Sequence, residues 1–196
     1  MDERTKNDVL CTLDDTRLIQ RILKGQTGAY RYIVRRHRAA MVRFVGRMLP
    51  DGADVEDVVQ DVFVEAYQSL ANYRAERAAF PTWLSRVAYY TVLHHLRRKS
   101  VPMTSLDGDE SLLDTVSDEA ADSLWQTAGE AEVDALDQAL SMLRPEDRML
   151  VQLFYYDGKP LTEIAYVLDS KAGTLATRLC RIRKKLYVIL KTMERN

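Results

Sequence analysis

KPLTEIAYVLDSKAGTLATRLCRIRKKLYV, residues 159–188, contains two helical patterns separated by a short turn. Apolar residues within 161–168 recur with the period of a helix, residues 169–171 are turn formers, and a longer helical pattern begins at Ala172. Two helices joined by about three residues, the second one basic, are typical of a helix-turn-helix. Steps of 100° gather the apolar residues of the second helix into one stripe that must face a core: Leu175, Leu179, Ile182, Leu186 and Ile189.

The side opposite this stripe carries the groups that DNA recognition needs. Arginine can donate two hydrogen bonds to a guanine edge, and threonine and lysine bind phosphates or bases. A solvated cationic surface helix is the simpler interpretation of most basic stretches, but the short preceding helix and the apolar stripe favour DNA binding. The candidate DNA contacts are Lys171, Thr174, Thr177, Arg178, Arg181, Lys184 and Lys185.

The rest of the chain is also helical in pattern, which predicts an all-α fold of two small helical domains. We expect a four-helix domain over residues 1–99, a flexible linker over 100–132 and a helix-turn-helix domain over 133–196, with a helix from Pro145 to Tyr156. The four N-terminal helices are expected from Asp14 and Asp15 to Gly25, from Gly28 to Leu49, from Asp54 as the N-terminal cap to Leu70, and from Pro81 to Lys99.

The charge of the chain is unevenly distributed. The net charge is −1, yet residues 1–99 carry 17 Lys+Arg against 12 Asp+Glu, and residues 144–196 carry 11 against 6. Residues 100–143 carry 11 acids and no Lys or Arg. Two basic blocks separated by an acidic segment suit two nucleic-acid-binding domains, although a solvated acidic linker between two ordinary domains would have the same composition.

Several classes of protein are disfavoured by the sequence. No apolar run approaches the roughly 20 residues that span a bilayer, and the charged N-terminus has no signal core, so we expect a cytoplasmic protein without membrane insertion. Cys11 and Cys180 lack metal-ligand spacing and are expected to be thiols. The three histidines (His37, His94, His95) show no i,i+4 metal pair, and no phosphate-binding loop or nucleophile elbow is present. We therefore expect neither an enzyme nor a bound metal or cofactor.

The helix-turn-helix resembles the C-terminal DNA-binding domain of extracytoplasmic-function (ECF) RNA polymerase sigma factors, through Ile164-Ala165, Gly173-Thr174, Arg178-Leu179 and residues 183–186. A second resemblance lies in the N-terminal half. Residues 54–63, DVEDVVQDVF, are similar to the polymerase-binding helix of the family, and residues 80–98 are similar to its promoter −10 helix. The two resemblances occur in the order and spacing of the family. They imply an alternative sigma factor, with sigma region 2 in residues 1–99 and sigma region 4 in residues 133–196.

The resemblance implies that the third helix binds the clamp coiled coil of core RNA polymerase, with the flap as a further contact on the enzyme. In this helix Val55, Val59, Val62, Ala66 and Leu70 are expected to form the core stripe. The opposite, acidic face with an apolar centre would dock the polymerase, whereas without the resemblance it would be interpreted as an ordinary solvated face. The implied polymerase contacts are Asp54, Asp57, Gln60, Asp61 and Val64.

The fourth helix and the loop before it are implied to bind the −10 element. In this helix the expected core face comprises Leu84, Val87, Ala88, Thr91 and His95, with Trp83 also in the core and His95 hydrogen-bonded and not a metal ligand. Aromatic and basic side chains on another face suit unstacked bases, and the loop 72–77 is the candidate for capturing a flipped base. The implied −10 contacts are Tyr73, Arg74, Arg77, Arg86, Tyr90, His94, Arg97 and Arg98.

The sequence departs from the family pattern at three places. Tyr90 stands where the family often has a small amide, the loop between Tyr73 and Trp83 is one residue longer than usual, and Ala176 and Cys180 replace a basic and a larger residue. These departures put individual DNA contacts in doubt. The resemblance also implies an anti-sigma protein as partner. Two alternatives stay open: a stand-alone helix-turn-helix regulator with an N-terminal sensor, and a sigma-like adaptor that no longer binds DNA.

Overall fold

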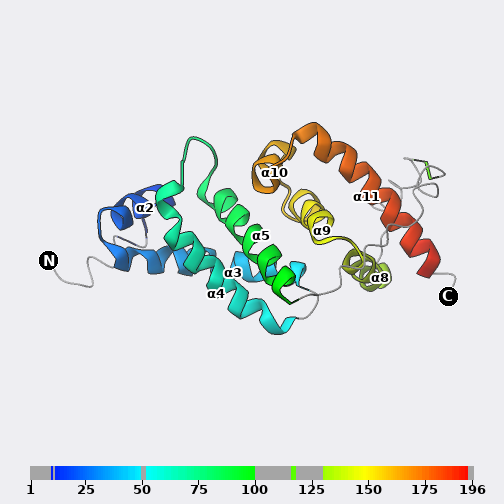
Figure 1. Cartoon of the computed structure of the whole chain (residues 1–196), viewed down its shortest axis with the longest axis horizontal. Helices are drawn as coiled ribbons and strands as arrows, with labels where there is room; N and C mark the ends of the chain where they lie inside the picture. Colours follow the sequence, from blue (N-terminus) through cyan, green and yellow to red (C-terminus); the bar gives the residue numbers. More distant parts are fainter. Residues whose placement is uncertain (1–9, 11, 50–51, 100–115, 118–129, 194–196) are drawn as a thin grey trace. The chain divides into compact units, whose positions relative to one another are not determined.

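The computed structural model describes residue 10 and residues 12–49, 52–99, 116–117 and 130–193, and among these residues all regular secondary structure is helical, with no strand (Figure 1). The chain divides into two compact units, residues 1–99 and residues 100–196. The predicted all-α class with two helical domains is therefore confirmed. Most of the linker expected over 100–132 lies outside the described residues, and the first helix of the second unit within the described residues begins at Glu130.

The described part of the first unit contains the α-helices α2 (Asp15–Leu23), α3 (Tyr30–Met48), α4 (Val55–Gln68) and α5 (Phe80–Arg98). Short 3-10 turns lie between them, at Thr27–Ala29, Gly52–Asp54 and Leu70–Asn72. Helix α2 begins as predicted, because the Asp14 side chain accepts a hydrogen bond from the backbone N–H of Arg17 at 2.8 Å. It ends at Leu23, and Gly25, two residues further on, has a φ of +94°, which suits a residue without a Cβ.

The start of α4 was predicted at the right residue but for the wrong reason. Asp54 occupies the N-cap position, yet its side chain makes no capping hydrogen bond. The carboxylate instead pairs with two residues near the end of α5, His95 and Lys99. Asp54 thus ties the start of α4 to the end of α5, which is a tertiary role and not a local one.

The core of the first unit lies between α3, α4 and α5. Helix α4 buries the predicted valines Val59 and Val62 together with Val58 and Phe63, which the predicted stripe left out. For α5 the predicted face was partly wrong, since Val87, Thr91 and His95 are half-buried. Its buried positions span a wider arc because the helix packs against both α3 and α4: Phe80, Thr82, Trp83, Leu84, Ser85, Ala88, Tyr89, Val92, Leu93 and Leu96.

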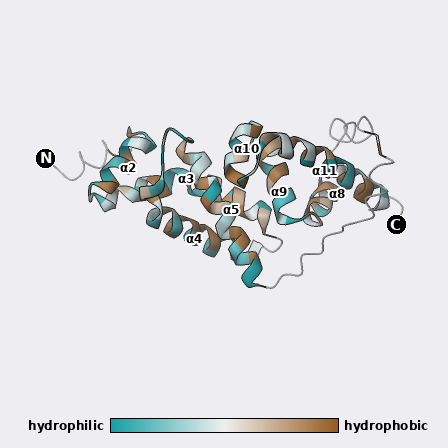
Figure 2. Ribbon diagram, turned by 45° about the horizontal axis from the view of Figure 1, so that its top comes forward, coloured by the Kyte–Doolittle hydropathy of each residue, from teal (hydrophilic) through white to brown (hydrophobic). Residues whose placement is uncertain are grey.

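The second unit contains α8 (Glu130–Ser141), α9 (Pro145–Val151), α10 (Leu161–Leu168) and α11 (Ala172–Met193). Colouring by hydropathy shows apolar and polar residues alternating along these helices (Figure 2). The helix predicted from Pro145 to Tyr156 is present, but its last five residues, Gln152–Tyr156, form a π-helical turn. In α11 four of the five predicted stripe residues are buried, and Leu190 is buried in place of Ile189.

The helix-turn-helix forms where the sequence predicted it. Helix α10 ends at Leu168, and the next residue, Asp169, adopts a left-handed conformation with φ of +53° and ψ of +50°. Aspartate tolerates this conformation better than most residues because its short polar side chain can bond locally. The backbone N–H of Ser170 then bonds to the carbonyl of Ala165 at 3.0 Å and closes the turn. Helix α11 begins directly after this turn, at Ala172.

Candidate functional site

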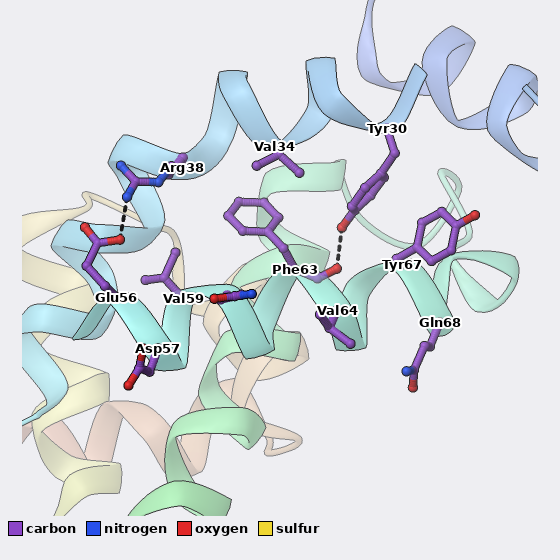
Figure 3. A pocket seen from close by; sticks show the side chains of 11 residues that line it. Tyr30, Val34, Arg38, Glu56, Asp57, Val59, Phe63, Val64, Tyr67 and Gln68 are labelled. Carbon is purple, nitrogen blue, oxygen red and sulfur yellow. Dashed lines mark hydrogen bonds and ion pairs between the residues drawn. The ribbon is translucent and has the colours of Figure 1, made fainter. Parts of the chain in front are cut away.

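A groove of about 520 Å³ lies between α3 and α4 (Figure 3). Val34 of α3 and Val59 and Phe63 of α4 form its apolar floor, and Val64, which is 47% exposed, stands at its edge. Such an exposed apolar residue beside an apolar groove is typical of a surface that binds a protein partner. The full lining comprises Tyr30, Val34, Arg38, Glu56, Asp57, Val59, Gln60, Phe63, Val64, Tyr67 and Gln68.

One end of the groove is fixed by Tyr30. Its hydroxyl donates to the backbone carbonyl of Phe63 at 2.6 Å, and its ring meets that of Tyr67 edge-on with centroids 4.9 Å apart (Figure 3). Burial raises the pKa of Tyr30, and the nearby Tyr67 raises it further, so the hydroxyl stays protonated and able to donate. No local sequence pattern predicts this bond, because it joins residues 33 positions apart.

The polar rim of the groove is partly neutralised within the chain. Arg38 of α3 forms an ion pair with Glu56 of α4, drawn as a dashed line in Figure 3. Asp57 and Gln60 are exposed on the same rim. Three of the five predicted polymerase contacts, Asp57, Gln60 and Val64, therefore lie together on this groove.

The other two predicted polymerase contacts lie elsewhere. Asp54 accepts from Lys99 and lies 3.2 Å from His95 Nε2, and the hydrogen bonds from Lys99 and then His95 lower the pKa of its carboxyl. His95 is thus hydrogen-bonded as predicted, although half-buried. Asp61 lines a second hollow, on the α5 side of α4.

This second hollow, of about 630 Å³, lies between α4 and α5. It brings together four of the eight predicted −10 contacts, Arg86, Tyr90, His94 and Arg98. Arg97 is exposed but does not line it. The predicted site did not include most of the opposite wall, where Asp61, Glu65 and Ser69 follow one another at intervals of four residues along α4. The four-residue spacing places these three side chains on one face of α4, and it could have revealed this wall from the sequence. The remaining lining residues are Val64, Asn72, Trp83, Val87, Thr91 and His95.

The loop before α5 is held by packing as well as by backbone bonds. The Tyr73 ring lies 5.5 Å from the rings of both Phe80 and Trp83, so this predicted base contact also closes the aromatic core. Arg74 donates to the carbonyls of Ala71 at 2.7 Å and of Tyr73 at 3.0 Å. Arg77 is exposed, and its backbone N–H bonds to the carbonyl of Arg74. Trp83 is 6% exposed and belongs to the core, as predicted.

The predicted DNA-binding helix α11 presents Thr174, Thr177 and Arg181 to solvent, and Lys171, directly before the helix, is also exposed. Arg178 differs, because its Nε donates to the Asp147 carboxylate in α9 at 2.5 Å. Asp147 is buried, so this bond joins the helix to the core of the unit. Lys184 and Lys185 are half-buried further along the helix. The exposed groups thus gather over the first three turns.

Among the described residues, no helix is long and apolar enough to cross a bilayer. In the same part of the chain, no group of three His, Cys, Asp or Glu side chains is placed to hold a metal ion.

Two parts of the chain match family profiles. Sigma-70 region 2 matches residues 33–101, which include the hollow and all of the groove except Tyr30, and sigma-70 region 4 matches residues 134–186, which include α10 and most of α11. The ECF RNA polymerase sigma-E factor of Escherichia coli K12 is 30% identical over 181 residues, covering 89% of this chain and 93% of that protein. The chain belongs to the ECF family of RNA polymerase sigma factors.

Further relatives agree. The RNA polymerase sigma-H factor of Pseudomonas aeruginosa is 30% identical over 192 residues, covering 92% of this chain and 96% of that protein. The fold is also shared with the sigma factor RpoE of Bartonella quintana, solved in complex with the anti-sigma factor NepR, at a TM-score of 0.59 and 18% identity over 83% of this chain and 96% of that one. The chain is an alternative sigma factor, a transcription initiation factor that directs RNA polymerase to specific promoters.

Proposed function

We propose that this ECF sigma factor binds core RNA polymerase, the −10 element and the −35 element through three separate surfaces. The groove between α3 and α4 binds core RNA polymerase at its clamp coiled coil, with Asp57, Gln60 and Val64 in contact. The observation that carries this assignment is the combination of an exposed apolar edge, Val64, with an acidic rim at Asp57, since a basic amphipathic helix would complement both. In the proposal Asp54 shapes the surface through His95 and Lys99, and Asp61 serves both the clamp and the adjacent hollow.

The hollow between α4 and α5 receives the melted −10 element. Arg86, Tyr90, His94 and Arg98 gather aromatic and cationic groups at one place, which is the combination that single strands require. The strand also passes the loop before α5, where it meets Tyr73, Arg74 and Arg77, and the end of α5, where it meets Arg97. The loop supplies the wall against which a base flipped from the duplex would rest.

Helix α11 reads the −35 element in the major groove. Thr174, Thr177 and Arg181 reach base edges and phosphates, and Lys171, Lys184 and Lys185 hold phosphates. Arg178 contributes mainly by fixing the helix through Asp147. The polymerase flap would hold this unit at the distance that the promoter spacing demands.

Regulation by an anti-sigma protein that covers the polymerase and DNA surfaces completes the proposal. Its support is that B. quintana RpoE was solved in complex with the anti-sigma factor NepR. In this proposal the chain is a cytoplasmic binding subunit and not an enzyme, and it needs no cofactor. A stand-alone helix-turn-helix regulator is disfavoured because the similarity to sigma-E spans both units.

Binding of purified core polymerase tests the first surface. Val64→Glu places a charge at the apolar edge of the groove and should weaken association with core polymerase at least about tenfold in a labelled-chain titration. Leu23→Glu is the matched control, because Leu23 is 55% exposed and lies outside the groove. Equal affinities of the two variants would contradict the assignment of the groove.

A further inference from the structure

The positive charge of the first unit is concentrated in one stretch of the chain. Residues 16–50 contain nine Lys and Arg and no Asp or Glu. Helix α3 therefore has no carboxylate of its own, and it lacks the i,i+4 ion pairs that offset charge on many solvated helices. Only an anion from outside the helix can neutralise its cations. The arginines of α3 are all exposed: Arg31, Arg35, Arg36, Arg38, Arg43 and Arg47.

Carboxylates of neighbouring helices neutralise arginines at the two edges of this exposed surface. At one edge, Arg36 Nη1 lies 2.5 Å from the Asp15 carboxylate of α2. At the other edge, Arg38 forms its ion pair with Glu56 of α4. Steps of 100° per residue place Arg35 and Arg43 between these two edges. Neither of these two arginines forms an ion pair with any residue that the structure describes, so both are available to a partner.

The spacing of the two central arginines suits the backbone of duplex DNA. A rise of about 1.5 Å per residue separates Arg35 from Arg43 by about 12 Å along the axis of α3. The major groove of B-DNA is also about 12 Å wide, so one arginine can reach the phosphates on each edge of the groove. Ala39 lies midway between the two arginines and is exposed, and its short side chain lets the helix approach closely. A guanidinium group can donate two parallel hydrogen bonds to one phosphate.

We infer that the α3 face, which comprises Arg35, Ala39 and Arg43, binds the phosphate backbone of the duplex promoter DNA next to the melted segment. The contact carries no sequence information, because it reaches phosphates and no base edges. None of the three residues lines the groove or the hollow, so the α3 face is a fourth surface besides the three proposed above. The inference rests on the proposed function, in which the same unit holds the melted −10 element.

The salt dependence of promoter binding tests this inference. Holoenzyme assembled from core polymerase and the full-length chain is titrated with promoter DNA across a series of salt concentrations. Each contact with a duplex phosphate contributes about 0.9 to the slope of log K against log salt concentration. Arg35→Gln combined with Arg43→Gln removes two contacts, so the slope should become shallower by about 1.8, and by the same amount on promoters of different sequence. Glutamine is a good helix former, so α3 should persist and the affinity for core polymerase should not change.

A matched control separates a local contact from the general effect of charge. Arg17→Gln combined with Lys24→Gln removes two exposed cations of α2 and its C-terminal cap, and it should keep the wild-type slope. An unchanged slope in the α3-face variant, or an equal change in the control, would overturn the inference. Weaker binding to core polymerase with an unchanged slope would assign the face to an acidic protein partner and also overturn it. Wild-type holoenzyme that binds no promoter would overturn the proposed function and the inference with it.

Discussion

Residues of the same type in this protein have different roles, and sequence patterns do not distinguish these roles. Arg178 and Arg181 are both basic residues of α11, yet Arg178 bonds to buried Asp147 whereas Arg181 is exposed. The pattern of basic residues predicted both as DNA contacts. Asp147 lies 31 positions away from Arg178, so no local spacing reveals that one of the two arginines fixes the helix.

Substituting the two arginines separately should give different results. Arg181→Ala should weaken binding of the polymerase holoenzyme to its promoter by about 1–3 kcal/mol without changing the melting temperature, because it removes a base contact only. Arg178→Ala should cost about 1–3 kcal/mol of folding free energy, since it leaves the buried Asp147 carboxylate unpaired. Thermal melting and filter retention of promoter complexes measure the two effects. The assignment fails if Arg181→Ala melts as early as Arg178→Ala.

Asp15 should make the first unit sensitive to acid. Burial alone would raise the pKa of its carboxyl, but hydrogen bonds and charge from His37, 3.0 Å away, and from Arg36 lower it below the usual value of about 3.9. A lowered pKa stabilises the fold above about pH 4, and this contribution is lost as the pH falls through the lowered pKa. Asp15→Asn should therefore be less stable than wild type in urea unfolding at pH 7, with the difference shrinking below about pH 4. A difference that is constant with pH would contradict this.

The bounds of a helix could be predicted from the sequence where residue spacing and end capping alone determine them. Helix α10 has the predicted bounds, and α2 begins with the predicted cap, because spacing and capping are local. The capping role of Asp54 was predicted wrongly because its partners, His95 and Lys99, lie 41 and 45 residues away. The predicted face of α5 failed for a related reason, since a helix packed against two neighbours buries a wider arc than one stripe. For the candidate site, the sequence predicted which helix faces carry the functional side chains. It did not predict that these faces form two concave surfaces, one on either side of α4.

The turn of the helix-turn-helix offers a prediction at the scale of this element. Asp169 has φ of +53°, a conformation that glycine adopts without cost and β-branched residues avoid. Asp169→Gly should keep or slightly raise the melting temperature, and Asp169→Val should lower the stability by about 1–2 kcal/mol. Differential scanning calorimetry of the two variants provides the measurement. Equal stability of Gly and Val at this position would show that the turn relaxes to another conformation.

The whole molecule combines two basic ends with an acidic segment, and this charge order should restrain DNA binding. Residues 100–143 carry 11 acids, which compete with phosphates for the cations of the two units. Neutralising Asp107, Asp109, Glu110 and Asp114 to their amides should strengthen binding of the chain alone to random duplex DNA at low salt. The gain should vanish near 1 M salt, where the Debye length is about 3 Å. Fluorescence anisotropy across a salt series measures it, and a salt-independent gain would point to a structural cause.

The central claim is that this ECF sigma factor uses the groove between α3 and α4 to engage RNA polymerase and thereby start transcription at chosen promoters. Run-off transcription with purified core polymerase, on a fragment upstream of the gene for this protein and on a genomic promoter pool, tests it most directly. The account predicts discrete start sites that appear only when the chain is added, and that disappear with Asp57→Lys combined with Val64→Glu but persist with Leu23→Glu. Start sites that survive the groove variant, or a wild-type chain that neither binds core polymerase nor yields a start site, would contradict it.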